Sequence, residues 1–326
     1  MDNDKYFISV DWGTSRFRLR LVECSPLHIV ETLTPSGGGV RELYEHWKTN
    51  GGDRETLFLD FLHHQVRGLK TPLSGQIKIV ISGMASSSLG MQELPYAKLP
   101  FAADGKNIIA RTLSPASHPA YEILLISGVS SGKDVIRGEE TQLIGCLSGE
   151  DPGPDLRLLI FPGTHSKHFF VKNNTVFDFS TYMTGEFFQL LSAHSVLSAS
   201  VEMGQDMYAH GASDSFKKGV RASVNANLLN TAFRVRTHHL FHEMSPKDNF
   251  SYLSGLLIGT ELQELGKTDI SRIYLICGSN LNIPYMAALQ ELGFQEKTSF
   301  YPAAWSDEIV VKGQYVILKN RHLHAG

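Results

Sequence analysis

Residues able to bind phosphate and a metal ion gather at the end of an apolar segment near the N-terminus. Asp11 follows the run Ile8-Ser9-Val10, and Gly13, Thr14 and Ser15 come shortly after it. Glycine lets the backbone approach a phosphate closely, while Thr and Ser add hydroxyl and N–H donors. A carboxylate at this place could hold a hydrated Mg²⁺ against the same phosphates. An ordinary β-hairpin turn can carry the same residues, so this segment alone leaves both interpretations open.

The same pattern returns in the second half of the chain. The apolar run 158–161 leads into a Gly-Thr turn and a second apolar strand, and Asn173-Asn174 predicts a tight turn into a third strand over 175–180. The candidate phosphate-binding residues of this second turn are Gly163, Thr164, His165, Ser166 and Lys167. Two such hairpins, one in each half, indicate an internal duplication. Facing each other across a cleft, they could hold one polyphosphate from both sides.

Carboxylates crowd the start of a predicted helix between the two hairpins. Asp134, Glu139 and Glu140 follow a glycine-rich loop, and the apolar residues behind them predict a helix. Acids are common at helix N-termini because the helix dipole favours negative charge there, so ordinary capping is one explanation. The other is a general base, Glu139 or Asp134, that accepts the proton of a substrate hydroxyl during phosphoryl transfer. We favour the general base because this segment leads directly to the second hairpin.

Three further motifs are weaker. Gly128-Val-Ser130-Ser-Gly132 matches the nucleophile elbow of α/β serine hydrolases, with Ser130 as nucleophile, but this interpretation leaves both Gly-Thr hairpins unexplained. Gly132-Lys133 does not fit a P-loop, because that motif requires a glycine at position 127 and a hydroxyl residue at 134. His238 and His242 have a zinc-ligand spacing for a helix, yet no third ligand is evident and a solvated helix face is the better explanation.

Regular elements must position these residues. The chain predicts strands over 27–33, 76–81, 122–126 and 272–277, a helix over 57–69 and a helix-rich stretch over 185–265. The loop 83–90 and the turn Gly278-Ser279, which opens a helix through 292, both follow strand C-termini, where ligands usually bind in α/β folds. The segment 149–154, rich in Pro and Gly, predicts a boundary between domains 1–153 and 154–326.

The composition is typical of a soluble protein with two globular domains. The 326 residues are 42% hydrophobic and 19% charged, and the net charge of −3 argues against nucleic acid or an anionic membrane as partner. Apolar runs are too short to cross a membrane, and the acidic N-terminus predicts no signal peptide. Three isolated cysteines fit a reducing cytoplasm. We therefore expect small-molecule partners, and the sequence leaves open whether the chain forms a homo-oligomer.

With these motifs in order, the chain resembles the 2-dehydro-3-deoxygalactonokinase (2-keto-3-deoxygalactonate kinase) family of the actin, hexokinase and Hsp70-ATPase superfamily. The resemblance extends over most of the chain, from residue 6 to about 295. It rests on Val10-Asp11-Trp12-Gly13-Thr14 with Arg18, Ser82-Gly83-Met84 with Pro95-Tyr96, Gly128-Val129-Ser130, Asp134 to Gln142, Pro162 to Lys167, Met183-Thr184-Gly185-Glu186 and Ser254 to Gly259. It implies an α/β two-domain, ribonuclease H-like duplicated fold with an ATP cleft between the domains.

The resemblance also implies an activity and a set of roles. The activity is phosphorylation of 2-dehydro-3-deoxy-D-galactonate at O6 with MgATP, in galactonate catabolism. Asp11 would serve Mg²⁺, and Glu139, where related sugar kinases carry an Asp, would be the base, with Asp134 as alternative. The phosphate and adenosine contacts would come from Gly13, Thr14, Ser15, Arg18, Gly163 to Lys167, Gly278 and Ser279. We expect Arg137 and the loop residues Gly83, Met84 and Ser86 to bind the sugar acid, since Arg suits a carboxylate, although Arg137 could equally be a structural ion-pair partner of a nearby acid.

Two other functions remain conceivable on the same fold. An actin-like phosphatase or exopolyphosphatase would use water in place of the sugar acid. A sugar-acid sensor would bind its ligand without turnover, although two phosphate hairpins with carboxylates beside them argue against it.

Overall fold

The chain divides into two units, each built on its own mixed β-sheet. The computed structural model describes residues 5–149, 153–203, 212–301 and 305–322. Unit 1 comprises Met1–Pro152, Asn174–Phe177 and Asp307–Gly326, and unit 2 comprises Gly153–Asn173 and Asp178–Ser306. The break at 152–153 falls within the Pro- and Gly-rich segment. Residues 307–322, which the sequence analysis placed with the second half, group with unit 1.

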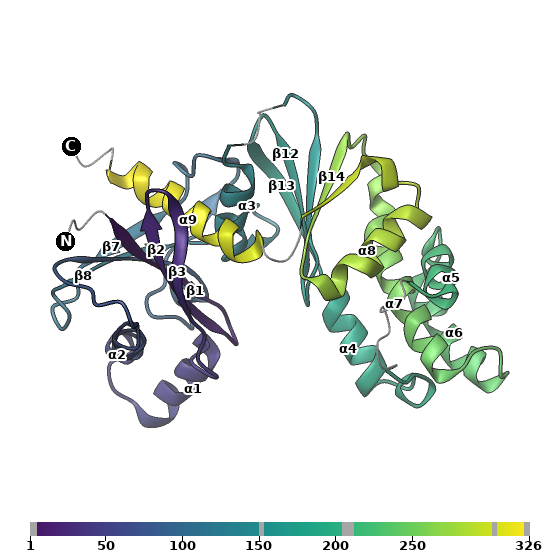
Figure 1. Cartoon of the computed structure of the whole chain (residues 1–326). Coiled ribbons are helices and arrows are strands. Elements are labelled where there is room, and N and C mark those ends of the chain that lie inside the picture. Colours follow the sequence, from purple (N-terminus) through teal and green to yellow (C-terminus); the bar gives the residue numbers. More distant parts are fainter. Residues whose placement is uncertain (1–4, 150–152, 204–211, 302–304, 323–326) are drawn as a thin grey trace. The chain divides into compact units, whose positions relative to one another are not determined.

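The sheet of unit 1 carries the first hairpin at its centre (Figure 1). Its strands follow the order β3-β2-β1-β4-β8-β7. Their bounds are β1 Tyr6–Trp12, β2 Phe17–Cys24, β3 Leu27–Leu33, β4 Ile77–Gly83, β7 Ala110–Leu113 and β8 Tyr121–Ile126. Strand β2 runs antiparallel to both β1 and β3, whereas β4 is parallel to both β1 and β8. The carboxyl ends of β1 and β4 therefore meet at one edge of the sheet, as expected for a ligand-binding edge.

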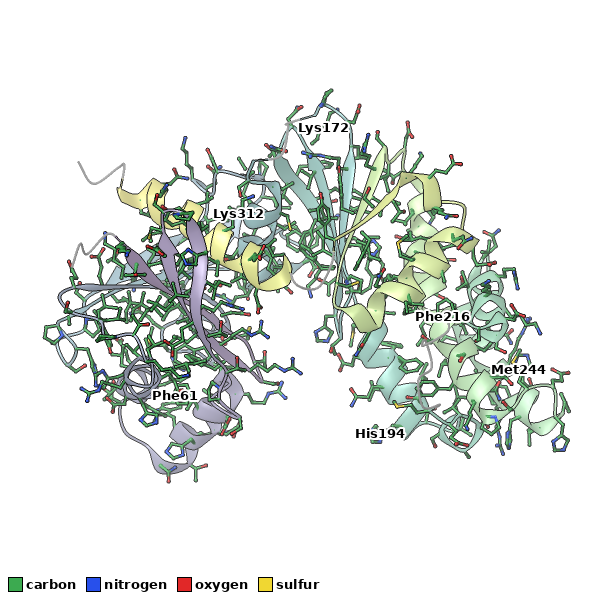
Figure 2. All side chains as sticks on the ribbon, in the orientation of Figure 1. Phe61, Lys172, His194, Phe216, Met244 and Lys312 are labelled. Carbon is green, nitrogen blue, oxygen red and sulfur yellow. The ribbon has the colours of Figure 1, made fainter. Side chains whose placement is uncertain are left out.

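Alternating side chains of β1 divide between the two faces of this sheet. Ile8, Val10 and Trp12 enter a core shared with helices α1 (Val40–Asn50) and α2 (Arg54–Arg67). Helix α2 begins where the Asp53 side chain accepts from Thr56 N, and it buries residues at helical spacing, among them Phe58 and Leu62. Phe61 packs at the edge of the same core (Figure 2).

Phe7 points to the opposite face of the sheet, toward helix α9 (Trp305–His322), which packs against helix α3 (Glu139–Leu147). Its ring stacks on Tyr315 of α9. The backbones of α3 and α9 touch, because a Cβ on Gly145 would lie 1.8 Å from Ile309 O and one on Gly313 would lie 1.9 Å from Thr141 O. Alanine at either glycine would force the two helices apart. Four two-residue strands complete unit 1: β5 (Ala97–Lys98), β6 (Phe101–Ala102), β9 (Val129–Ser130) and β10 (Val135–Ile136).

Unit 2 repeats the strand order of unit 1. Five consecutive strands of its sheet follow the order β15-β14-β11-β12-β13, with bounds β11 Arg157–Phe161, β12 Ser166–Lys172, β13 Thr175–Tyr182, β14 Arg272–Ile276 and β15 Thr298–Tyr301. Strand β11 pairs antiparallel with β12 and parallel with β14, and β14 is parallel to β15. This is the arrangement of β1 with β2, β4 and β8. The predicted duplicated α/β fold is confirmed by this correspondence.

Helices make up most of residues 184–267, as the sequence predicts. They are α4 (Thr184–His194), α5 (Asp214–Ser223), α6 (Leu228–Leu240) and α7 (Pro246–Leu262), and α8 (Ser279–Glu291) follows β14; short 3₁₀ turns occur at Met84–Ser86, Ser198–Ser200, Gln263–Lys267 and Gln295–Lys297. Helix α7 is buried along almost its whole length. It lies against α5, where a Cβ on Gly255 would meet Phe216 O at 2.0 Å. Phe216 is part of the core of unit 2 (Figure 2).

Two local interpretations of the sequence are not realised. Ser130 does not stand on a strand-to-helix elbow: it lies in β9, which pairs antiparallel with β10, so the serine-hydrolase alternative loses its geometry. His238 and His242 do not share a helical face, because α6 ends at Leu240 and His242 has a φ of 56°. Within the described residues, no helix combines the length and apolar character needed to cross a membrane.

Candidate active site

Asp11 lies at the carboxyl end of β1, at the edge of the unit 1 sheet where the carboxyl ends of β1 and β4 meet. The pairing of strands places it opposite Arg18 on β2 and Ser82 on β4. Its Oδ2 lies 4.0 Å from Arg18 Nη1, and 31% of its side chain is exposed. Burial raises the pKa of Asp11, while the positive charges of Arg20 and Arg18 oppose that rise.

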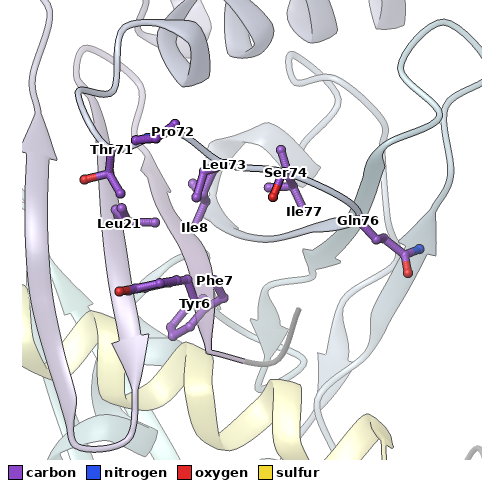
Figure 3. Close-up of a pocket in the computed structure, with 10 residues that line it drawn as sticks. All are labelled: Tyr6, Phe7, Ile8, Leu21, Thr71, Pro72, Leu73, Ser74, Gln76 and Ile77. Carbon is purple, nitrogen blue, oxygen red and sulfur yellow. The ribbon is translucent and has the colours of Figure 1, made fainter. Parts of the chain in front are cut away.

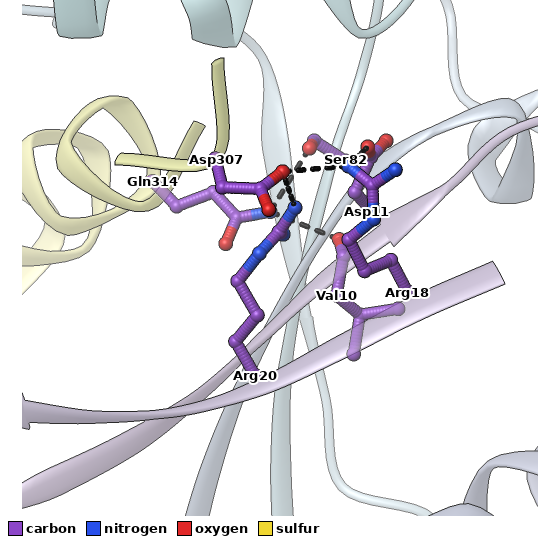
Figure 4. Close-up of polar contacts among 7 residues, drawn as sticks. All are labelled: Val10, Asp11, Arg18, Arg20, Ser82, Asp307 and Gln314. Atoms are coloured by element: carbon purple, nitrogen blue, oxygen red, sulfur yellow. Dashed lines mark hydrogen bonds and ion pairs between the residues drawn. The ribbon is translucent and has the colours of Figure 1, made fainter. Parts of the chain in front are cut away.

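A polar network joins the start of α9 to this edge (Figure 4). Asp307 Oδ1 accepts from Arg18 Nη1 and from Arg20 Nη2, each at 2.6 Å. Gln314 Nε2 donates to Val10 O and to Ser82 Oγ, both at 2.9 Å, and thereby joins the ends of β1 and β4. The sequence analysis did not single out Arg20, Asp307 or Gln314, because their hydrogen-bond partners are distant in the sequence.

The first phosphate turn is braced from behind by helix α1. Gly13 N donates to Arg16 O within the turn. The first N–H groups of α1, at Val40 and Arg41, donate to the carbonyls of Gly13 and Thr14, both at 3.0 Å. The Gly13 amide is therefore bonded within the turn, whereas Thr14 is half-buried and Ser15 is exposed.

The two candidate bases lie in different parts of unit 1. Glu139 lies near Asp11, whereas Asp134 lies in a hairpin turn. Glu139 opens α3, its Oε2 accepts from Arg137 N at 3.0 Å, and its charge contributes to the raised pKa of Asp11. Asp134 lies in the turn between β9 and β10, where its Oδ1 accepts from Val135 N. The neighbouring Glu140 is fully buried, and burial together with the Glu139 charge raises its pKa to about 7.

The four predicted sugar-acid residues come together in the structure. Arg137 Nη1 donates to Ser86 O and Ser86 Oγ, both at 2.6 Å. Gly83, with a φ of 96°, lies at the end of β4 and leads directly into Met84–Ser86. A Cβ on Gly138 would lie 3.4 Å from the Gly83 Cα, so the loop before α3 runs beside the loop after β4.

Arg137 also lies over an aromatic ring. Its guanidinium carbon is 4.3 Å from the centroid of Tyr96, one of the residues that carried the family resemblance. Stacking of this kind orients a guanidinium while leaving donors at its edge available. Arg137 Nε is buried and makes no hydrogen bond among the described residues.

In unit 2, the second phosphate turn is braced by helix α4. Glu186 N donates to Thr164 O at 3.1 Å, and the Glu186 carboxylate lies 2.5 Å from His165 Nε2. A Cβ on Gly185 would meet Gly163 O at 2.7 Å, so only glycine allows α4 to begin this close to the turn. This support corresponds to the one that α1 gives the first turn.

Two predicted phosphate ligands of unit 2 point inward instead. Ser166 is fully buried, and its hydroxyl donates to Glu261 Oε1 at 2.7 Å. Lys167 is 7% exposed, and its Nζ donates to His165 O at 3.0 Å. Thr164 and His165 remain exposed at the turn. The turn predicted to bind adenosine has the expected strand–turn–helix form, since β14 ends at Ile276 and Gly278 is the exposed N-cap of α8 with Ser279 as its first residue.

An apolar cavity of unit 1 lies at the opposite end of β1 from Asp11. It is lined by Tyr6, Phe7 and Ile8 together with the segment 71–77 (Figure 3). Its volume of about 100 Å³ and the lack of charged side chains along its wall do not suit a nucleotide or a sugar acid. The Asp11 edge remains the candidate site of unit 1.

Comparison with known proteins assigns the family. The family model described as 2-keto-3-deoxy-galactonokinase matches residues 11–312. A probable 2-dehydro-3-deoxygalactonokinase of Rhizobium meliloti (strain 1021) is 30% identical over 315 residues, covering 94% of this chain and 95% of its own. The 2-dehydro-3-deoxygalactonokinase of Escherichia coli (strain K12) is 29% identical, covering 88% and 90%.

A solved structure agrees with the sequence relatives. It is that of a Sinorhizobium meliloti protein named as a 2-dehydro-3-deoxygalactonokinase, with a TM-score of 0.77, 27% identity and coverage of 97% of this chain and 96% of its own. The family match spans both phosphate hairpins, the α3 carboxylates and the Arg137–Ser86 cluster. The chain belongs to the 2-keto-3-deoxy-galactonokinase family.

Proposed function

We propose that this chain is a sugar-acid kinase that transfers the γ-phosphate of ATP to O6 of 2-dehydro-3-deoxy-D-galactonate. Membership of the family and the names of the two curated relatives support the reaction class and the acceptor. The observation that carries the proposal is local to unit 1. Asp11, Glu139 and the Arg137–Ser86 pair all come from segments that end at, or follow, the carboxyl ends of its parallel strands.

Phosphoryl transfer mainly requires that the reacting groups are positioned and that the charge on the phosphates is stabilised. Glu139 accepts the proton of the attacking hydroxyl, because it opens α3 beside Asp11, whereas Asp134 is engaged in a hairpin turn. Arg137, held by Ser86 and Tyr96, offers its remaining N–H groups to the carboxylate of the acid. Gly83 lets the acceptor loop turn sharply beside Gly138.

Asp11 fits the role of a magnesium ligand. Mg²⁺ bound with ATP keeps several waters and takes one or two protein carboxylates, and Asp11 is a partly exposed carboxylate beside the first phosphate turn. When bound, Mg²⁺ neutralises charge on the phosphates of the nucleotide.

The remaining roles follow the positions of the two turns. Thr14 and Ser15, with Arg18, bind phosphate in unit 1, and Gly163, Thr164 and His165 do so in unit 2. Ser166 and Lys167 act through the shape of the second turn, since both side chains point inward. Gly278 and Ser279 form the adenosine turn.

The test is ADP release with MgATP and a panel of acceptors: 2-dehydro-3-deoxygalactonate, its gluconate epimer, galactose and no acceptor. We expect release with 2-dehydro-3-deoxygalactonate above all others. Equal release with the gluconate epimer would replace the proposed specificity with a broader one. Release without any acceptor would instead indicate a phosphatase of the same fold.

A further inference from the structure

Glu261, on helix α7, is a buried carboxylate that receives four hydrogen bonds. Its side chain is 1% exposed. Ser166 Oγ donates to Oε1 at 2.7 Å, and Tyr285 OH and Thr184 Oγ1 donate to Oε2 at 2.7 and 2.5 Å. His168 Nε2 lies 2.9 Å from Oε1 and donates as well, because an ionised carboxylate can only accept.

These donors keep the Glu261 carboxylate ionised, whereas burial alone would favour its neutral form. Burying a carboxylate costs several kcal/mol unless donors replace the lost water. Burial by itself raises the pKa of Glu261, but His168 and the hydroxyl donors outweigh it and the pKa lies below its ordinary value. A fully satisfied buried network of this kind specifies one arrangement of the segments that supply it.

The four donors come from the segments that form the nucleotide side of unit 2. Ser166 and His168 lie on β12, directly after the second phosphate turn. Thr184 is the first residue of α4, the helix whose Gly185 and Glu186 brace that turn. Tyr285 lies on α8, the helix that begins at the adenosine turn.

We propose that Glu261 is the positioning residue that fixes the second phosphate turn, its bracing helix α4 and the adenosine helix α8 in the geometry that binds ATP. The proposal rests on the proposed function. Glu261 does not need to touch the nucleotide: it acts through Ser166, Thr184 and Tyr285. The buried hydroxyl of Ser166, which the sequence assigned to phosphate, then belongs to this support instead.

The test compares Glu261→Gln with the wild type. The amide keeps the shape but places an NH₂ group against hydroxyl or imidazole donors, so part of the network must break or reverse. We expect the KM for ATP to rise about tenfold or more with the KM for the sugar acid within twofold, and MgATP binding measured by calorimetry to weaken in step.

Hydrogen exchange supplies a readout that a purely stabilising role would not move. The Glu186 amide is bonded to Thr164 O, so its exchange reports whether α4 stays docked on the turn. We expect faster exchange in peptides covering 183–188 of Glu261→Gln, with the sheet of unit 1 unchanged. Glu291→Gln is the matched control: Glu291 pairs with exposed Arg221 on the same unit and should behave as wild type.

A lowered melting temperature with unchanged KM for ATP and unchanged exchange at 183–188 would overturn the proposal. If Glu261→Gln does not fold, Thr184→Val and Tyr285→Phe carry the test, since each removes one donor and keeps the carboxylate; both should raise the KM for ATP about threefold. Wild-type protein that binds no MgATP would overturn the proposed function, and with it the nucleotide role of Glu261, even if exchange at 183–188 still responds.

Discussion

The guanidinium of Arg20 is buried in the sheet of unit 1 and paired with the half-exposed carboxylate of Asp307. Nη2 of Arg20 donates to Asp307 Oδ1 at 2.6 Å, and the two side chains are 0% and 44% exposed. Nε and Nη1 of Arg20 make no hydrogen bond among the described residues. Asp307 therefore balances a buried charge close to Asp11 and joins the last helix to the second strand of the chain.

Asp307→Asn should destabilise unit 1. The substitution leaves the Arg20 charge buried without a carboxylate opposite, which costs several kcal/mol in a fully buried pair and less here because Asp307 is partly exposed. We expect the free energy of unfolding, measured with urea, to fall by about 1–3 kcal/mol. Glu308→Gln, one residue further and exposed, is the control and should change it by less than about 0.5 kcal/mol.

Asp11→Ala should abolish turnover while the protein stays folded. The side chain is the proposed magnesium ligand at the end of β1, and the strand contains no other carboxylate that could replace it. ADP release in the presence of saturating acceptor is the measurement, with Asp60→Ala on the exposed face of α2 as control. Activity within tenfold of wild type would rule out the metal role of Asp11.

Glu139→Gln should separate the two candidate bases. Removing a general base lowers kcat by about 10²-fold or more, and the change should leave the KM for ATP near its wild-type value. Asp134→Asn, in the turn between β9 and β10, should lower kcat by less than about threefold. The opposite ranking of the two variants, measured at the pH optimum, would transfer the role to Asp134.

Local patterns predicted the parts of the site that are local in the chain. Both phosphate hairpins, the strand over 27–33 and the strand–turn–helix at Gly278 depend on alternation and turn residues a few positions apart, and each is found in the structure. The nucleophile-elbow interpretation of Ser130 was wrong, although the five residues of the motif match. The backbone there is determined by the pairing of β9 with β10 and not by the local sequence.

The supporting residues escaped prediction because their partners are distant in sequence. Arg20 and Asp307 are separated by 287 positions, and Ser166 and Glu261 by 95. A single charged residue in a strand or in an otherwise buried helix gives no periodic signal. Such residues become visible only when tertiary packing supplies the donors and acceptors that justify their burial.

Glu140→Gln should change the pH dependence of stability. Burial and the neighbouring Glu139 raise the pKa of Glu140 from 4.5 to about 7. The folded state therefore holds this proton more tightly than the unfolded state does. The contribution to stability is fully present below pH 4.5, is lost as pH rises toward 7, and stays lost above it, for a total of about 3 kcal/mol.

Glutamine cannot ionise, so the variant should not show the loss of stability that ionisation of Glu140 causes as the pH rises. The amide can still accept from Gly138 N, the shorter of the two bonds made by the carboxylate. Urea unfolding of both proteins at pH 5 and pH 8 should show the variant gaining about 2–3 kcal/mol relative to wild type at the higher pH. Glu45→Gln, on the exposed face of α1, should run parallel to wild type, and an equally parallel Glu140→Gln would mean that Glu140 is already ionised at pH 5.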